Sequence, residues 1–184
     1  MSLIGYFDQL GGLFMAGRKV VSGIRVEEAI TDFLFHFPFF DRLSRDELDL
    51  VANHIHIIEL DPGDVLFKEG DKGDSVFFIV EGELDVIKEP RSRNDWGIDN
   101  VVITKLSKGR SIGEMSVIDK IPRSATVRAA KKSTLVTLTA HGFDMVLKDY
   151  PTIGVKILTG VAQLLSLNLR KTSSLLVDSL VPIL

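Results

Sequence analysis

Glycine-containing turns at short intervals are the feature that most restricts the fold of this 184-residue chain. The turn sequences DPGD, EGD, KGD and EGE fall within residues 61–83, and glycine, proline and aspartate all favour tight turns. Among these turns lie segments 65–67, 75–80 and 84–87, which are rich in β-branched and aromatic residues. Short strands that recur about every 8–12 residues indicate an all-β sandwich, roll or barrel rather than a βαβ sheet.

Helical patterns precede the predicted strands. Ser44 followed three residues later by Glu47 is a capping-box pattern, which predicts a helix over residues 44–54. Residues 1–40 look helical in places and contain closely spaced phenylalanines. We expect these rings to pack beneath the strands, and a cluster of exposed rings would instead suit a partner surface.

Beyond the glycine-rich turns, the chain changes from strand patterns to helical ones. The polar segment 89–100 is predicted to be a hairpin loop, and residues 134–139 alternate like a final strand. Helical spacing of apolar residues follows from position 141, stops at Pro151 and resumes over residues 152–176. The sequence therefore predicts a mainly β domain with flanking helices.

The composition excludes several classes of protein. Hydrophobic residues make up 45% of the chain, enough for a substantial core, and the formal net charge of −3 argues against a broad nucleic-acid-binding surface. The absence of cysteine fits a reducing cytoplasm. No uninterrupted apolar run approaches the roughly 20 residues of a membrane helix, so we predict no membrane span and a cytoplasmic location.

The segment 111–127 combines the residue types that an anionic ligand with a sugar hydroxyl requires. Gly113 lets the backbone approach a ligand closely, and the residues after it are expected to form a short helical turn. Glu114 can accept a hydrogen bond from a hydroxyl, and Arg123 can place a planar charged fork on phosphate oxygens. Ser124 adds an N–H and a hydroxyl. This pattern predicts a small, charged phosphate pocket.

The same segment resembles the phosphate-binding cassette of cyclic nucleotide-binding domains, which occur in bacterial cAMP receptor proteins, protein kinase A regulatory subunits and cyclic nucleotide-gated channels. The resemblance covers about residues 38–170. It implies an eight-stranded, jelly-roll-like β-roll with an N-terminal helical bundle and C-terminal lid helices. On this basis we divide the chain into an N-terminal helical extension (1–40), a binding roll with a helical lead-in (41–140) and C-terminal lid or coupling helices (141–184).

The resemblance also implies which residues contact the ligand. They are Gly113, Glu114, Met115, Ser116, Arg123, Ser124 and Ala125 in the cassette, and Leu164 and Asn168 on the C-terminal helix. Leu164 and Asn168 are four residues apart and so share a helix face, from which they are expected to cover the base. Members of the family that select cGMP often carry threonine at the position of Ala125, so cAMP is the favoured ligand and cGMP stays open.

The implied function is that of a signalling module rather than an enzyme. Binding of a cyclic nucleotide is expected to move the C-terminal helix and to signal to a partner or effector, with no cofactor and no metal. The apolar segment 175–184 is a candidate surface for a homodimer or an effector protein. Too few residues follow the long helix for a helix-turn-helix domain, so no direct DNA binding is expected.

Two alternatives stay open at this point. The cassette could be a degenerate one in a nucleotide-independent scaffold, in which Arg123 and Glu114 form an ordinary ion pair. His54, His56 and Glu59 resemble the metal-binding motif of cupins, which are β-barrel proteins that include metal enzymes. The spacing to Glu59 is one or two residues short, and no later histidine completes the motif.

Overall fold

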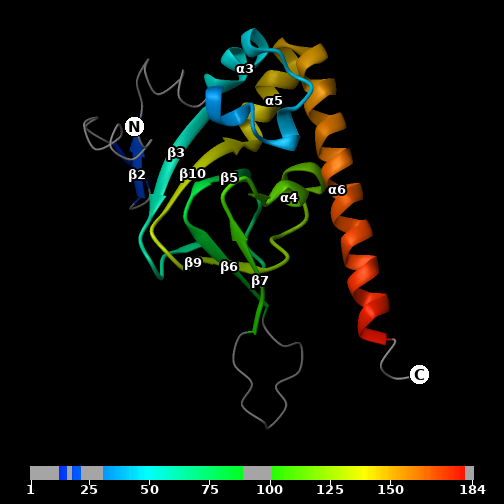
Figure 1. The fold of residues 1–184 in the computed structure, drawn as a ribbon. Helices are drawn as coiled ribbons and strands as arrows, with labels where there is room; N and C mark the ends of the chain where they lie inside the picture. The colour runs from blue at the N-terminus through cyan, green and yellow to red at the C-terminus, as the bar shows by residue number, and fades with distance from the viewer. Residues whose placement is uncertain (1–12, 16–17, 22–30, 89–100, 181–184) are drawn as a thin grey trace.

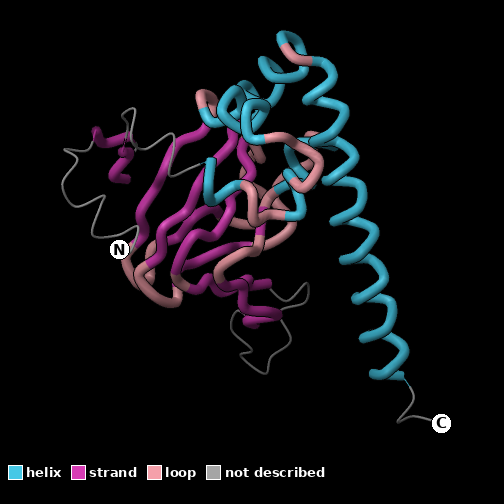
Figure 2. The backbone as a smooth tube through the Cα atoms, turned by 45° about the horizontal axis from the view of Figure 1, so that its top comes forward, coloured by secondary structure: helices cyan, strands magenta, loops and turns pink. Residues whose placement is uncertain are grey.

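A computed structural model of the chain describes residues 13–15, 18–21, 31–88 and 101–180, with side chains described over 31–88 and 101–177. The strands form two antiparallel sheets that pack face to face, and the helices gather at one end of them (Figure 1). The long C-terminal helix runs along the side of the strands and past them (Figure 2). This arrangement confirms the predicted mainly β fold with flanking helices.

Both sheets have antiparallel pairing throughout the described strands. The first sheet contains, in spatial order, β1 (Leu13–Met15), β2 (Arg18–Val21), β3 (Ile55–Leu60), β10 (Ser133–Thr139), β5 (Ser75–Glu81) and β8 (Ser111–Ile112). The second sheet contains β4 (Val65–Phe67), β9 (Thr126–Ala129), β6 (Glu83–Lys88) and β7 (Val101–Ser107). Strands β3 to β10 are the eight strands of the expected roll. The predicted hairpin loop 89–100 lies outside the described residues.

Strand β5 divides the hydrophobic core into two parts, because alternate side chains of a strand point to opposite faces. Phe77 and Ile79 pack between the two sheets. Phe78 points the other way, where its ring centroid lies 5.0–5.1 Å from those of Phe37, Phe39 and Phe40. These phenylalanines are almost fully buried, as the sequence predicts for rings packed beneath the strands.

The helices lie where local signals predict them, with ends that differ by one to four residues from the predicted ranges. Helix α3 (Arg45–Ala52) begins with the expected capping box, in which Ser44 and Glu47 exchange hydrogen bonds. A short 3₁₀ helix, η1 (Pro38–Phe40), precedes it. Helix α5 (Ala140–Asp149) and helix α6 (Pro151–Leu180) meet at Tyr150, immediately before the proline.

The N-terminal residues differ in part from their predicted helical state. Residues 31–34 are helical, whereas β1 and β2 form a strand pair at the edge of the first sheet. Val20 and Val21 of β2 pair with Ile58 and Ile57 of β3. The predicted helical extension over residues 1–40 therefore also contains strands: β-branched residues beside an open sheet edge gain ladder hydrogen bonds that local spacing does not reveal.

Helix α6 is fixed to the rest of the domain through its first half. Ile153, Ile157 and Val161 are buried in the core, and a Cβ atom at Gly160 would lie 2.4 Å from the carbonyl oxygen of Phe39. By length and composition alone the segment Pro151–Val177 could cross a membrane, with 28% of its most apolar window buried in the domain. Core helices pass the same test, so the expectation of no membrane span stays a prediction.

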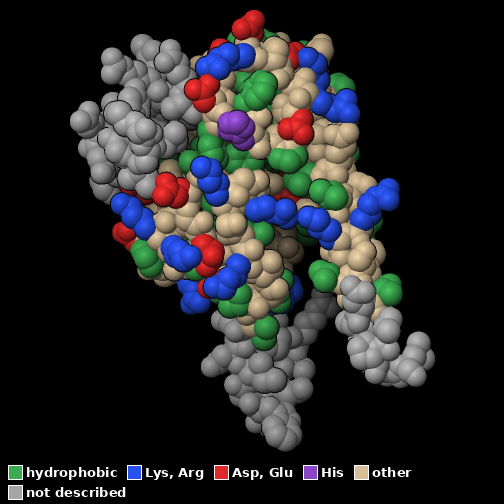
Figure 3. Space-filling view, viewed as in Figure 1, with side chains coloured by type: hydrophobic (Ala, Val, Ile, Leu, Met, Phe, Trp, Pro, Cys, Tyr) green, Lys and Arg blue, Asp and Glu red, His purple; other side chains and the backbone are tan. Residues whose placement is uncertain are grey.

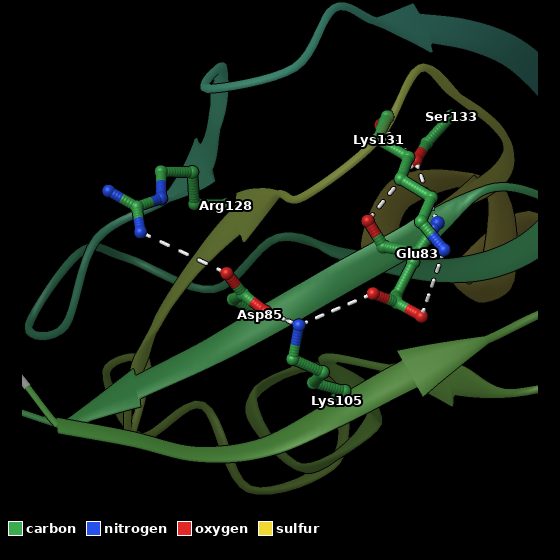
Figure 4. Close-up of polar contacts among 6 residues, drawn as sticks. All are labelled: Glu83, Asp85, Lys105, Arg128, Lys131 and Ser133. Carbon is green, nitrogen blue, oxygen red and sulfur yellow. Dashed lines mark hydrogen bonds and ion pairs between the residues drawn. The ribbon is translucent and has the colours of Figure 1, made fainter.

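A network of charges covers the outer side of the second sheet (Figure 4). Asp85 on β6 lies between Lys105 on β7 at 3.4 Å and Arg128 on β9 at 3.9 Å. Glu83 contacts Lys105 and Lys131 at 3.4 and 3.5 Å. These cross-strand pairs are partly exposed, so they specify which strands are neighbours more than they stabilise the fold.

Candidate functional site

The cassette begins where β8 ends. Gly113 has φ of +90° and precedes helix α4 (Glu114–Asp119), which confirms the helical turn expected at this point. A Cβ atom at Gly113 would lie 2.3 Å from Nη1 of Arg123 and 2.9 Å from the carbonyl oxygen of Ser75. Glycine is therefore required twice, by the backbone angle and by the close approach of the arginine.

Arg123 is only 4% exposed, and its guanidinium is held by backbone groups and aromatic rings. Nη1 donates to the carbonyl oxygen of Gly113 at 3.0 Å, and Nη2 donates to that of Ser75 at 2.8 Å. The guanidinium carbon lies 4.2 Å from the centroid of the Phe67 ring and 5.6 Å from that of Phe77. Nε is buried and has no hydrogen-bond partner among the described residues.

Burial and charge act in opposite directions on this arginine. Burial lowers the pKa of Arg123, while Asp74, Asp71 and Glu114 raise it. A guanidinium stays protonated in proteins, so the site holds a permanent positive charge in a place of low solvation. Such a charge favours an anionic partner in the space beside it.

The backbone of Arg123 is fixed by the turn that follows β4. Its N–H donates to the carbonyl oxygen of Asp71 at 2.8 Å, and its own carbonyl accepts from the N–H of Gly70 at 2.9 Å. A Cβ atom at Gly73 would lie 2.0 Å from Cβ of Ser116, so the cassette helix rests directly on this second glycine turn. The glycine turns around Gly70 and Gly73 therefore also position the cassette.

Glu114 is 8% exposed, and burial raises the pKa of its carboxyl, with Arg110 and Arg123 acting against that rise. Within the described part of the chain, Arg123 and Glu114 form no ion pair. The structure therefore does not contain the ordinary Arg123–Glu114 ion pair of the scaffold alternative. The two charged groups therefore stay separate within the pocket-lining segment.

A pocket of about 510 Å³ opens between the cassette, the second sheet and α6. Eight of the nine residues predicted to contact a ligand line it: Gly113, Glu114, Met115, Ser116, Arg123, Ser124, Ala125 and Asn168. Leu164 does not; it lies in a neighbouring cavity of about 60 Å³ and packs against the core. Its position beside Phe37 and Phe39 fits the role of a core residue.

Several pocket residues were not found from the sequence. They are Phe67, Val86, Ile103, Thr104, Leu106, Arg110, Ser111, Ile112, Val127, Lys171, Thr172 and Leu175. Lys171, Thr172 and Leu175 follow Asn168 at intervals of three, four and seven, so helical spacing alone could have identified this face of α6. Lys and Arg side chains gather where the strands face α6 (Figure 3).

The residues of the histidine motif lie at and just before strand β3. No group of three His, Cys, Asp or Glu side chains suited to a metal ion occurs among the described residues. His56 on β3 is exposed, and His54 lies before the strand, where its Cβ packs on Gly142 of α5. His54 therefore lies outside the strand that carries His56 and Glu59.

Comparison with known proteins identifies sequence relatives of the chain. The family model described as "Cyclic nucleotide-binding domain" matches residues 57–150. A cAMP-dependent protein kinase regulatory subunit of Mycosarcoma maydis is 31% identical over 62% of this chain and 22% of that protein. A cyclic nucleotide-gated potassium channel of Rhizobium etli is 29% identical over 85% of this chain and 48% of the channel. The chain thus spans less than half of each of these relatives.

Solved structures share the architecture. A cyclic nucleotide-binding domain from Methylobacillus flagellatus superposes with a TM-score of 0.73 at 27% identity, covering 84% of both chains. A regulatory subunit of a cAMP-independent protein kinase A from Trypanosoma brucei has a TM-score of 0.60 at 26% identity, covering 76% of this chain and 48% of that one.

Proposed function

This chain belongs to the cyclic nucleotide-binding domain family of regulatory ligand-binding domains, and we propose that its ligand is a cyclic nucleotide, with cAMP favoured over cGMP. The observation that carries the proposal is the state of Arg123. Its charge is buried, its fork is held from one side by two carbonyls, and its Nε atom lines up with no acceptor among the described residues. A single negative charge in the adjoining pocket would complete this site.

The pocket residues divide the ligand between them in this proposal. Arg123 and Ser124 bind the cyclic phosphate, and the Glu114 carboxylate accepts from a ribose hydroxyl. Gly113, Met115, Ser116 and Ala125 form the wall that these groups share. A volume of about 510 Å³ is within the usual range of small-molecule pockets.

Helix α6 would contact the base. Asn168 carries an amide that can both donate to and accept from a purine edge, and Lys171, Thr172 and Leu175 lie beside it on the pocket wall. Leu164 would act from behind this face, through the core, rather than by covering the ring. Closing of α6 on the base is a shift in the populations of an open and a closed state. The ligand favours the closed state only as far as it binds that state more tightly than the open one.

We assign the three parts of the chain accordingly. Residues 41–140 bind the ligand and residues 141–184 respond to it, while the buried phenylalanines within residues 33–40 support the roll from beneath. The cytoplasm would supply such a ligand, and the cysteine-free sequence fits that compartment. No step in this proposal breaks a covalent bond, so the chain acts as a sensor and not as an enzyme.

A signalling domain of this kind needs a partner, and we place a second copy on the outer side of α6. Val155, Leu158, Ala162, Leu165, Leu169 and Leu176 recur at intervals of three, four and seven along the helix. This is the spacing of a coiled-coil seam, and all but Leu165 are exposed. No charged residue interrupts the seam, so two identical helices could pair without repulsion. An effector protein on this face is the alternative.

A nucleotide-independent scaffold stays the competing function, because three similar solved structures are described as regulatory subunits of cAMP-independent protein kinase A. Calorimetric titration of the purified, ligand-stripped chain with cAMP and cGMP, using AMP as the uncyclised control, separates the two. We expect micromolar or tighter binding of a cyclic nucleotide, about 8 kcal/mol, with AMP much weaker. No heat and no change in melting temperature with any of the three would establish the scaffold.

A further inference from the structure

Lys88, the last residue of β6, reaches the cassette from outside the pocket. Its Nζ atom forms an ion pair with Oε1 of Glu69 at 2.5 Å and donates to the carbonyl oxygen of Ser124. Lys88 is not one of the residues that line the pocket, whereas Ser124 is. The lysine therefore holds the cassette from outside the pocket.

This contact is one of several hydrogen bonds that fix the backbone of residues 123–126. Gly70 donates its N–H to the carbonyl of Arg123 at 2.9 Å, and Asp71 accepts from the N–H of Arg123 at 2.8 Å. Glu69 donates its N–H to Oγ1 of Thr126 at 2.9 Å. Between these anchors lies the peptide that joins residues 124 and 125. The lysine ammonium holds the carbonyl of that peptide.

The geometry of a trans peptide gives this contact a consequence inside the pocket. The described chain contains no cis peptide, so the carbonyl of Ser124 and the N–H of Ala125 point in opposite directions. The carbonyl points to Lys88, outside the pocket, and Ala125 lines the pocket. A cation on the carbonyl also polarises the peptide and makes its N–H a stronger donor.

We infer that Lys88 is a positioning residue, which orients and polarises the Ser124–Ala125 peptide so that the Ala125 N–H donates to the phosphate of the bound nucleotide. This inference rests on the proposed function of the pocket. Glu69 takes part by holding the ammonium, since a lysine with four rotatable bonds loses substantial freedom when it is fixed. No direct contact between Lys88 and the ligand is required.

The test compares Lys88→Met and Lys88→Arg with Lys131→Met in the full chain. Lys131 is a matched control, because it also contacts a glutamate, Glu83 at 3.5 Å, but on the outer side of the second sheet. Each protein is titrated with cAMP and with cGMP, and its melting temperature is recorded. The amide resonance of Ala125 is followed by NMR with and without cAMP.

We expect Lys88→Met to weaken binding of both nucleotides by the same factor, about three- to tenfold, which corresponds to one hydrogen bond. Lys88→Arg should restore most of the affinity, and Lys131→Met should stay within twofold of wild type. The shift of the Ala125 amide on adding cAMP should be smaller in Lys88→Met alone. This pattern separates a positioning role from general loss of stability, which a melting temperature would report.

Two results would overturn the inference while leaving the proposed function intact. One is wild-type binding with Lys88→Met indistinguishable from Lys131→Met. The other is a loss of affinity for only one of the two nucleotides, because the phosphate is common to both. If the wild-type chain binds neither nucleotide, the proposed function fails and this inference fails with it.

Discussion

The guanidinium carbon of Arg123 lies 4.2 Å from the centroid of the Phe67 ring, on a strand 56 residues earlier in the chain. This contact, together with the two carbonyl hydrogen bonds, fixes the long arginine side chain before any ligand is considered. A group held in place in this way loses little conformational freedom on binding, which increases affinity. In the proposed function, the aromatic ring would thus contribute to phosphate binding by holding Arg123 in place.

The first prediction concerns this arginine. Arg123→Ala should weaken cyclic nucleotide binding by about 2–5 kcal/mol, because the phosphate charge would be left without its partner. Arg128→Ala is the control, since Arg128 is on the neighbouring strand β9 and points to Asp85 on the outer surface. Calorimetry on both variants measures the difference. Affinity of Arg123→Ala within threefold of wild type would refute the proposed phosphate contact.

The second prediction separates backbone strain from steric contact at Gly113. Gly113→Ala and Gly109→Ala both place a side chain at positive φ, +90° and +83°, which costs about 1–2 kcal/mol. Only at Gly113 does the new Cβ atom meet Arg123, because nothing lies within 4 Å at Gly109. Chemical denaturation should therefore show a larger loss for Gly113→Ala, and calorimetry a loss of affinity in that variant alone. Equal effects on both properties would contradict the model of close approach.

The third prediction concerns Glu114, whose pKa is raised by burial. The folded state binds this proton more tightly than the unfolded state, so the stability contribution is present at low pH and is lost as pH rises through the raised pKa. Glu114→Gln should remove that loss and be more stable than wild type at neutral pH. It should also bind the nucleotide about tenfold more weakly, because a charged acceptor is lost. Unfolding curves and titrations at several pH values measure both; lower stability of the variant at neutral pH would contradict the sign.

The fourth prediction concerns the link between α3 and α6. Lys156 donates to both carboxylate oxygens of Glu47 at 2.6 and 2.7 Å, and this lowers the pKa of Glu47 from its usual 4.5, with the Ser44 N–H adding to the effect. Because the pKa is lowered, the stabilisation is present above pH 4.5 and is lost as pH falls through the folded value. Glu47→Gln keeps the capping box and should cost about 0.5 kcal/mol at neutral pH, since both groups are partly exposed.

Unfolding of Glu47→Gln and wild type across the acid range tests this link. The difference between them should disappear as the glutamate of the wild type becomes protonated. Glu81→Gln, at the exposed end of β5, is the control for removal of one negative charge. A difference that persists at low pH, or an equal effect of Glu81→Gln, would show that the ion pair with Lys156 is not the cause.

The fifth prediction concerns the outer side of α6. If a second copy pairs there, Leu169→Glu should convert the dimer to a monomer, because Leu169 is 68% exposed in the single chain and lies in the seam. Gln163→Glu adds the same charge to an exposed position off the seam and should leave the dimer intact. Sedimentation measures the mass of each, and a chain ending at Arg170 tests the part of the helix beyond it. A monomeric wild type would exclude the dimer and leave an effector as the partner.

Local signals in the sequence account for much of the fold and of the candidate site. The capping box at Ser44, the strands between the glycine turns and the helix break before Pro151 all follow from interactions within a few residues. The cassette is equally local, since Gly113 and Arg123 are ten residues apart. The resemblance carried by this local segment was therefore sufficient to indicate the family, and eight of the nine residues that it implies line the pocket.

Only the tertiary structure decided which distant groups meet. Phe67 beneath the guanidinium, Lys88 on the cassette carbonyl and the strand pair β1–β2 at the edge of β3 all join segments far apart in the chain. Local spacing sets which face of an element is apolar, but the neighbour of that face depends on how every element packs. For the same reason Leu164 faces the core while Asn168, one helical turn later, faces the pocket.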